Sequence, residues 1–153
     1  TTPFPSDSLD FTTAGRNLLH LSLFINGKQI SFLNGHLAWA KTTKEQLHQT
    51  QQGEILIKYL QTVVSPFIFT GDFNLDPENP LIKKINTFAK NLIDENHVIT
   101  TLNPRTHAAK VLFPPGAAVD YIFVTPDITV KKFDVLKNED LSDHFGLTAE
   151  LEL

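Results

Sequence analysis

Short apolar runs with polar residues between them predict most of the strands of this chain. Leu18 to Ile25 and Gln29 to Leu33 are two such runs, and Asn26-Gly27 separates them. Two strand-like runs joined by Asn-Gly are the strongest short signal for a β-hairpin. Further apolar runs predict strands at residues 67–70, 98–102, 119–125, 128–136 and 145–151.

Apolar residues at a spacing of three to four predict two helices between these strands. The first is expected over residues 44–64, with Thr43 as its N-cap and Ser65-Pro66 as its end. The second is expected to open at Asp76-Pro77 and to continue to Ile93.

This order of elements predicts the α/β class, with a mixed sheet and both helices on one of its faces. Leu19, Leu21 and Leu23 alternate toward one side of the first strand, whereas Leu18 and Phe24 lie toward the other. A sheet that is apolar on both faces needs a second covering layer, and few elements of the chain are left to supply it. Residues 103–118, with three prolines and a glycine, are expected to form a long loop of the kind that is often functional.

Composition narrows the class of protein. The chain has 153 residues, enough for one domain, and no apolar run reaches the roughly 20 residues of a membrane span. It contains no cysteine, which excludes disulfides and thiolate zinc sites. The net charge of −4 is opposite to that of a DNA-coating surface, so a phosphate substrate would need a local cation. The absence of methionine leads us to expect a processed product or a fragment.

Asp72 and Asn74 follow a buried strand, in the sequence Thr-Gly-Asp-Phe-Asn. A carboxylate and an amide two residues apart on an extended chain point the same way and can bind a phosphate oxygen or a hard cation. The alternative is a turn ahead of a helix that Asp76 caps. A calcium loop of the EF-hand type is excluded, because Pro77 and Lys83 occupy its glycine and glutamate positions.

Three further carboxylate or histidine positions are candidates. Asp143-His144 precedes the last strand and could pair a metal ligand with a general base, although a solvated turn is the alternative. Asp120 lies in an otherwise apolar strand and needs a partner, for which a histidine is suitable. His36 follows a predicted strand, where a structural or merely exposed histidine is the competing interpretation.

Taken together and in order, these segments resemble the C-terminal half of the endonuclease/exonuclease/phosphatase family of DNase I-like, metal-dependent phosphoesterases. The resemblance extends over nearly the whole chain. Its motifs are Leu33-Asn34-Gly35-His36-Leu37, Ile68 to Asn74, Val119 to Phe123, and Leu141-Ser142-Asp143-His144. Residues 1–153 would then be the C-terminal portion of one layered α/β sandwich domain.

The resemblance implies a role for each matching residue. Asp72 would orient or activate the attacking water or assist the leaving group, and Asn74 would hold the scissile phosphate or help to position the metal. His36 would donate to a phosphoryl oxygen. Asp143 would be a ligand of Mg²⁺ or Mn²⁺, and His144, oriented by Asp120, would bind phosphate or act as acid or base. The reaction would be hydrolysis of a phosphoester by a metal-assisted water.

The family also has an early strand that ends in a metal-binding glutamate, within a motif of the Leu-Gln-Glu type, and this chain has no such motif. We therefore expect the chain alone to bind metal weakly and to be inactive. Its expected partners are a phosphoester (nucleic acid, phospholipid or small molecule) and either the missing N-terminal half or a second copy against the open sheet face. The alternative function is a non-catalytic binding or scaffold module that retains the fold. Trp39 and Phe113, in loops beside the expected site, would contact substrate or simply pack.

Overall fold

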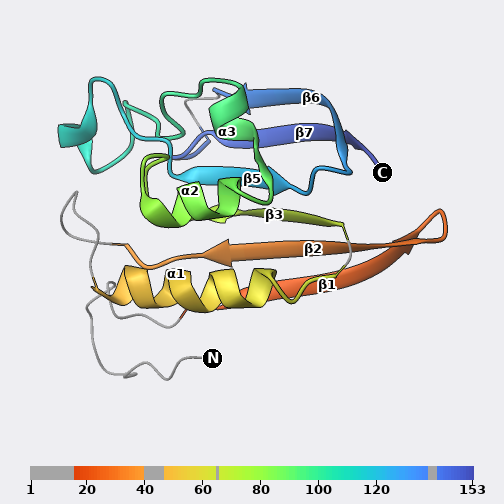
Figure 1. Cartoon of the computed structure of the whole chain (residues 1–153). Coiled ribbons are helices and arrows are strands. Elements are labelled where there is room, and N and C mark those ends of the chain that lie inside the picture. Colours follow the sequence, from red (N-terminus) through yellow and green to blue (C-terminus); the bar gives the residue numbers. More distant parts are fainter. Residues whose placement is uncertain (1–15, 40–46, 65, 138–140) are drawn as a thin grey trace.

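A computed structural model describes residues 16–39, 47–64, 66–137 and 141–153. It confirms the α/β class (Figure 1). Its elements, in chain order, are β1 (Leu18–Ile25), β2 (Lys28–His36), α1 (Leu47–Leu60), β3 (Phe67–Asp72), α2 (Pro80–Asn86), β4 (Lys90–Asn91), α3 (Leu92–Glu95), the short 3₁₀ helix η1 (Lys110–Leu112), β5 (Asp120–Val124), β6 (Thr129–Leu136) and β7 (Gly146–Glu152). Among these residues no helix is both long and apolar enough to cross a membrane.

Five strands form a mixed sheet in the order β1-β2-β3-β5-β4, and β6 and β7 form a separate two-stranded sheet. Only β2 and β3 run parallel within the five-stranded sheet, and its other neighbours are antiparallel. The predicted hairpin is present, with β1 paired to β2 from Leu18↔Gly35 to Ile25↔Lys28. Asn26 and Gly27 both have positive φ angles, as a tight hairpin turn requires.

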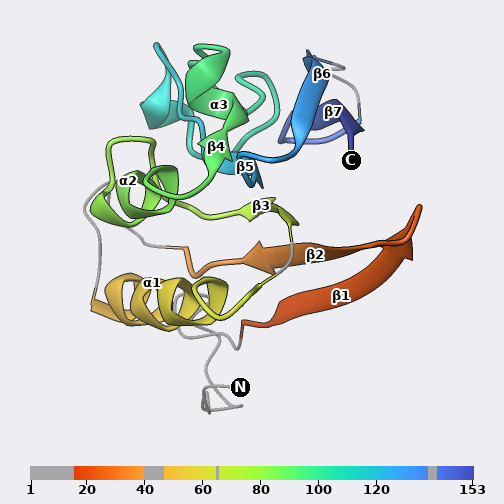
Figure 2. The same cartoon turned by 45° about the vertical axis from the view of Figure 1, so that its right-hand side comes forward.

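One face of the five-stranded sheet packs against helices α1 and α2, as expected from the sequence (Figure 2). Phe69 of β3 and Phe123 of β5 are fully buried on this face. Leu60 of α1 and Ile82 of α2 pack in the same cluster. The helices therefore pack against β3 and β5, two adjacent inner strands of the sheet.

The opposite face carries the second sheet, so the few elements expected to be left for this layer are the strands β6 and β7. Ile68, Ile122 and Val124 are buried on this face, and apolar residues of β6 and β7 pack against them. Figure 2 shows the β6–β7 pair and α1 on opposite sides of the five-stranded sheet. The covering is partial, because Leu19 and Leu21 of β1 remain 66% and 49% exposed.

The second predicted helix is interrupted, and it begins later than expected. Asn79, not Asp76, is the N-cap, and its side chain accepts the backbone N–H of Leu81 at 2.8 Å. The apolar spacing continues to Ile93, but Lys90-Asn91 leaves the helix and pairs with β5. Pairing with a central strand outweighs helix propensity here, and the side chain of Asn91 caps α3 instead.

Two other boundaries differ from the sequence-based expectation. Helix α1 ends at Leu60 instead of residue 64, and its predicted cap Thr43 lies outside the described residues. The strand expected at 98–102 reduces to one isolated bridge between Leu102 and His144. That bridge brings the segment before the 103–118 loop next to the segment that carries His144.

Candidate active site

Three of the candidate residues lie in one row across three adjacent strands. His36, the last residue of β2, is in register with Asp72 of β3, and Asp72 is in register with Asp120 of β5. Registered residues of neighbouring strands point to the same face. By the alternation along each strand, this is the face of Ile68 and Val124, which carries the second sheet. The site therefore lies at the edge of the space between the two sheets.

Gly71 makes this row possible because it lets β2 and β3 approach closely. A Cβ atom at Gly71 would lie 1.8 Å from the carbonyl oxygen of Gly35, and the φ angle of Gly71 is +154°. No side chain fits there, so the glycine of the Thr-Gly-Asp-Phe-Asn segment is required by geometry. The approach places the end of β2, with His36, directly beside Asp72.

A tight turn after β3 fixes Asp72 and Asn74 relative to each other. Oδ1 of Asp72 accepts the backbone N–H of Asn74 at 2.8 Å, and Asn74 has a φ angle of +52°. Asparagine tolerates this left-handed conformation better than most residues. The turn alternative is thus part of the structure, and the same turn carries the candidate chemistry.

The amide of Asn74 holds the neighbouring loop and His36. Its Nδ2 donates to the carbonyl of Leu37 at 3.0 Å and lies 3.2 Å from Nε2 of His36. The same Nε2 lies 3.5 Å from Oδ2 of Asp72, so it faces an amide donor on one side and a carboxylate acceptor on the other. Burial, followed by the charge of Arg16, lowers the pKa of His36, so its ring is neutral at pH 7. Among the hydrogen bonds of the described residues none uses Oδ1 of Asn74, and this oxygen is the atom left for a ligand.

The pKa of Asp72 is raised because its carboxyl group is buried near a second carboxyl group, that of Asp120. Burial and then the neighbouring charge of Asp120 raise the pKa of Asp72 from its ordinary 3.8 to about 6. The backbone N–H of Asn74 and the charges of His144 and Arg16 act in the opposite direction, without overcoming the first two causes. A carboxyl that titrates near neutral pH is suited to proton transfer, and a pair of close carboxylates is suited to a divalent cation.

The structure brings His144 to Asp120. Nδ1 of His144 donates to Oδ2 of Asp120 at 2.9 Å, and the hydroxyl of Thr101 donates to the same oxygen at 2.6 Å. The hydrogen bond that His144 donates to Asp120 is the largest cause of the raised pKa of His144. With Nδ1 engaged, Nε2 of His144 is the nitrogen that can accept or deliver a proton at a substrate.

Asp143 and the long loop form the outer part of the site. Asp143 is exposed, and its backbone carbonyl accepts the N–H of Asn103 at 2.9 Å. Asn103 is fully buried and also donates its Nδ2 to the carbonyl of Ser142 at 2.9 Å. Sequence analysis missed Thr101, Asn103 and His107, because only long-range contacts bring this segment to His144.

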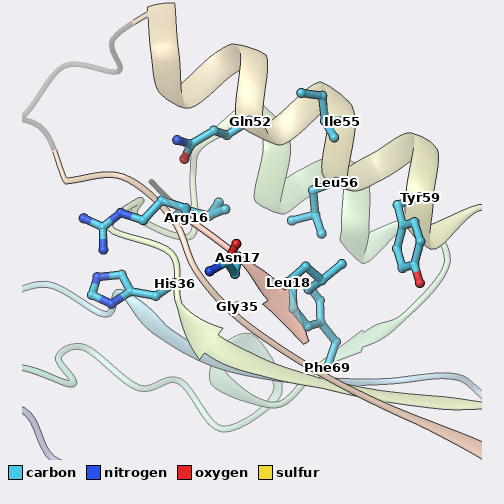
Figure 3. Close-up of a pocket in the computed structure, with 11 residues that line it drawn as sticks. Arg16, Asn17, Leu18, Gly35, His36, Gln52, Ile55, Leu56, Tyr59 and Phe69 are labelled. Atoms are coloured by element: carbon cyan, nitrogen blue, oxygen red, sulfur yellow. The ribbon is translucent and has the colours of Figure 1, made fainter. Parts of the chain in front are cut away.

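A cavity of about 310 Å³ opens beside His36, between β1 and α1 (Figure 3). Arg16, Asn17 and His36 line its polar end, whereas Leu56 and Phe69 belong to the apolar part. Arg16 was also missed from the sequence, where it lies at the margin of the first strand with no motif around it. Its positive charge influences the pKa values of both Asp72 and His36.

The described residues offer two sets of side chains that could hold a metal ion. One set comprises Asp72, Asp120 and His144, and in each set the ligand-type atoms lie within 4.8 Å of one another. The other set comprises His107, Asp143 and His144. His144 is common to both, and neither set contains a glutamate.

Comparisons with known proteins agree on the family. The family model for the endonuclease/exonuclease/phosphatase family matches residues 9–144. A search of curated proteins found no match.

Solved structures of the same family share the fold. An endonuclease/exonuclease/phosphatase from Bacteroides vulgatus is 25% identical, with a TM-score of 0.61 over 84% of this chain and 51% of that one. TDP2 from D. rerio, complexed with a single-strand DNA product, is 18% identical, with a TM-score of 0.68 over 90% of this chain and 62% of that one. A mannosyl-6-phosphatase of Bacteroides thetaiotaomicron is 18% identical, with a TM-score of 0.60 over 84% and 53%.

The chain thus spans between 51% and 62% of the length of these three structures. Among the residues that the structure describes, the second sheet consists of the two strands β6 and β7. The match of the family model covers most of the chain, including the segments around His36, Asp72, Asp120 and His144. The chain belongs to the endonuclease/exonuclease/phosphatase family.

Proposed function

We propose that this chain carries the C-terminal part of the active site of a metal-dependent phosphoester hydrolase. The observation that supports this most strongly is the row of His36, Asp72 and Asp120 across three strands, with His144 hydrogen-bonded to Asp120. Two histidines and two carboxylates at one sheet end provide donors for a phosphate and a base for a water molecule.

The residues present fit a hard divalent cation. Burial and then the charge of Asp120 raise the pKa of Asp72, so a second positive charge close to these two carboxylates would be favourable. Carboxylate oxygens are ligands of Mg²⁺ and Mn²⁺, and we assign Asp143 as a further ligand. When bound, the cation would offset this negative charge and polarise a phosphoryl oxygen.

The role that we propose for each side chain follows from the atom that can still contact a water molecule, the phosphate or the cation. Asp72, with its pKa near 6, would accept a proton from the attacking water. His36, whose lowered pKa keeps the ring neutral at pH 7, would donate its N–H to a phosphoryl oxygen. His144 would contact phosphate or transfer a proton through Nε2, while Asp120 holds its ring in place. Oδ1 of Asn74 would help to position the cation.

The substrate class is a phosphoester, of a nucleic acid, a phospholipid or a small molecule. The solved structures with this fold include a mannosyl-6-phosphatase and TDP2 with a DNA product, and those ligands are properties of those proteins. The net charge of −4 favours local capture of a phosphate at the site over binding along an extended nucleic acid.

We further propose that this portion is inactive alone. Neither candidate metal set of the described residues includes a glutamate, and the chain spans little more than half of its structural relatives. Leu19, Leu21 and Leu23 of β1 leave an apolar surface that an N-terminal half of the domain, or a second copy of the chain, would cover.

The test is hydrolysis of bis-p-nitrophenyl phosphate in Mg²⁺, by this chain and by the longest product of its gene. We expect no turnover by the chain, weak Mg²⁺ binding that Asp143→Asn abolishes, and turnover by the longer product that Asp72→Ala removes. Robust turnover by the chain, lost in Asp72→Ala, would disprove inactivity.

A longer product that binds Mg²⁺ without hydrolysis would favour the alternative, a non-catalytic module. The DNA upstream of Thr1 supplies a second criterion, since a strand ending in glutamate favours the enzyme.

A further inference from the structure

His107 lies against the site although the residues proposed above do not include it. Its ring contacts that of His144 edge to face, with 5.3 Å between the ring centroids. One of its ring nitrogens also lies within 4.8 Å of a ring nitrogen of His144 and a carboxylate oxygen of Asp143. A single phosphoryl group, which presents several oxygens, is large enough to contact both rings.

The backbone holds His107 in this place. Its N–H donates to the carbonyl of Asn103 at 2.9 Å, and the buried Asn103 bonds to Ser142 and Asp143 at 2.9 Å each. The hydroxyl of Thr106 donates to the carbonyl of Ser142 at 3.1 Å. His107 and the Ser142-Asp143-His144 segment are therefore one connected unit, as a group that contacts a substrate must be.

A hydrogen bond also selects the tautomer of His107. Its Nδ1 accepts the backbone N–H of Ala109 at 3.1 Å, so the proton of the neutral ring is on Nε2. A metal ligand needs a free nitrogen lone pair, and the lone pair of His107 is used by Ala109. The ring is therefore arranged to donate a hydrogen bond and not to bind a cation.

The negative charges of nearby carboxylates explain why a hydrogen-bond donor at His107 would favour phosphate binding. Asp72, Asp120 and Asp143 are carboxylates that repel an approaching phosphate, and N–H groups that face the phosphate would add to the effect of the proposed cation in reducing this repulsion. We propose that His107 is a further substrate-contacting residue, whose Nε2–H donates to an oxygen of the phosphoryl group that His144 contacts. This inference rests on the proposed function, since it requires a phosphate at His144.

The experiment uses the whole chain and inorganic phosphate as the probe, with and without Mg²⁺. Histidine ¹H–¹⁵N NMR of the free chain should show His107 protonated on Nε2, and phosphate should shift the signals of both His107 and His144. His107→Leu, which removes the donor, should weaken phosphate binding about tenfold. His107→Gln retains an N–H donor at similar reach and should bind within about threefold of wild type.

Two controls distinguish the loss of a contact with phosphate from a loss of folding stability. His97→Asn removes an exposed histidine at the end of α3 and should leave phosphate binding unchanged. The urea midpoints of His107→Leu and His107→Gln should agree with each other, so that the difference in binding between these two variants reflects the donor.

The outcomes distinguish this inference from the proposed function. A phosphate response at His144 with none at His107, or equal binding by wild type and His107→Leu, overturns the role of His107 alone. Equal weakening in His107→Leu and His107→Gln also overturns it, because the donor would not matter. Loss of the Nε2 proton on addition of Zn²⁺ would show that His107 is a metal ligand, and this result would also overturn its role as a hydrogen-bond donor. Absence of any phosphate response at either histidine overturns both proposals.

Discussion

Nδ1 of His144 lies 2.9 Å from Oδ2 of Asp120, so an imidazole that precedes the last strand is held by a carboxylate at the start of β5. Because this hydrogen bond is the largest cause of the raised pKa of His144, Asp120→Asn should lower that pKa. The stability that a raised histidine pKa contributes is present below about pH 6.5 and is lost as the pH rises through the folded-state pKa. The variant should therefore lose more stability at pH 5.5 than at pH 8.

NMR titration of the His144 ring protons, with urea unfolding at both pH values, measures these effects. Asp143→Asn is the matched control, since Asp143 acts on His144 only as the last of the causes that raise its pKa. An unchanged pKa in Asp120→Asn, or an equal fall in Asp143→Asn, would contradict the assignment of Asp120 as the orienting residue.

Asp72→Asn should stabilise the protein at neutral pH. A carboxyl whose pKa rises from 3.8 to about 6 on folding favours the folded state below pH 4. This preference is lost as the pH rises through 6, and it corresponds to about 3 kcal/mol. Asparagine removes the charge and keeps an acceptor for the N–H of Asn74. The gain should be present at pH 7.5 and absent at pH 4.

Urea unfolding without divalent cations measures this gain across the pH range. Asp72→Ala also removes the acceptor for Asn74 and should be less stable than Asp72→Asn by about 1 kcal/mol. A destabilised Asp72→Asn at pH 7.5 would show that the carboxylate contributes to the fold and not only to the site.

Gly71→Ala should separate β2 from β3. The added Cβ would meet the carbonyl oxygen of Gly35 at 1.8 Å, which the backbone can relieve only by moving apart. We expect a loss of about 3 kcal/mol or more, or failure to fold. Gly27→Ala is the control, because Gly27 has a positive φ angle but nothing within 4 Å of an added Cβ. It should lose about 1 kcal/mol. Equal losses in the two variants would argue against the steric explanation.

The uncovered face of β1 should drive association of the isolated chain. Leu19 and Leu23 are 66% and 39% exposed on the face that the second sheet covers only in part. Leu19→Lys with Leu23→Lys should reduce self-association in sedimentation and reduce binding of a hydrophobic dye. Phe24→Lys is the control, since Phe24 is 77% exposed on the opposite face of the same strand. A wild-type chain that sediments as a monomer without binding dye would contradict this expectation.

The local parts of the fold could be predicted from sequence, and the parts that depend on distant partners could not. Asn26-Gly27 predicted the β1–β2 hairpin correctly because turn and strands are adjacent in the chain. The helix expected through Ile93 was too long, because no local signal shows that Lys90-Asn91 pairs with β5. The separation of β6 and β7 into a second sheet is likewise a tertiary effect.

The same distinction applies to the site. His36, Asp72 and Asp120 could be found because each follows or begins an apolar strand, and the register places them in a row. Thr101 could not be found, although its buried hydroxyl donates to Asp120 at 2.6 Å, because only the folded loop brings the two together. The catalytic and metal-binding roles of His36, Asp72, Asn74, Asp120, Asp143 and His144 remain predictions.

Because the row crosses β2, β3 and β5, the spacing of these strands fixes the distances between its residues. Neighbouring strands lie about 4.8 Å apart, a spacing set by backbone hydrogen bonds, so His36 and Asp120 are separated by two such steps, or about 10 Å. A side-chain substitution in this row changes charge without changing spacing. New substrates can therefore arise through the loops around the row, while the distances between its members stay constant.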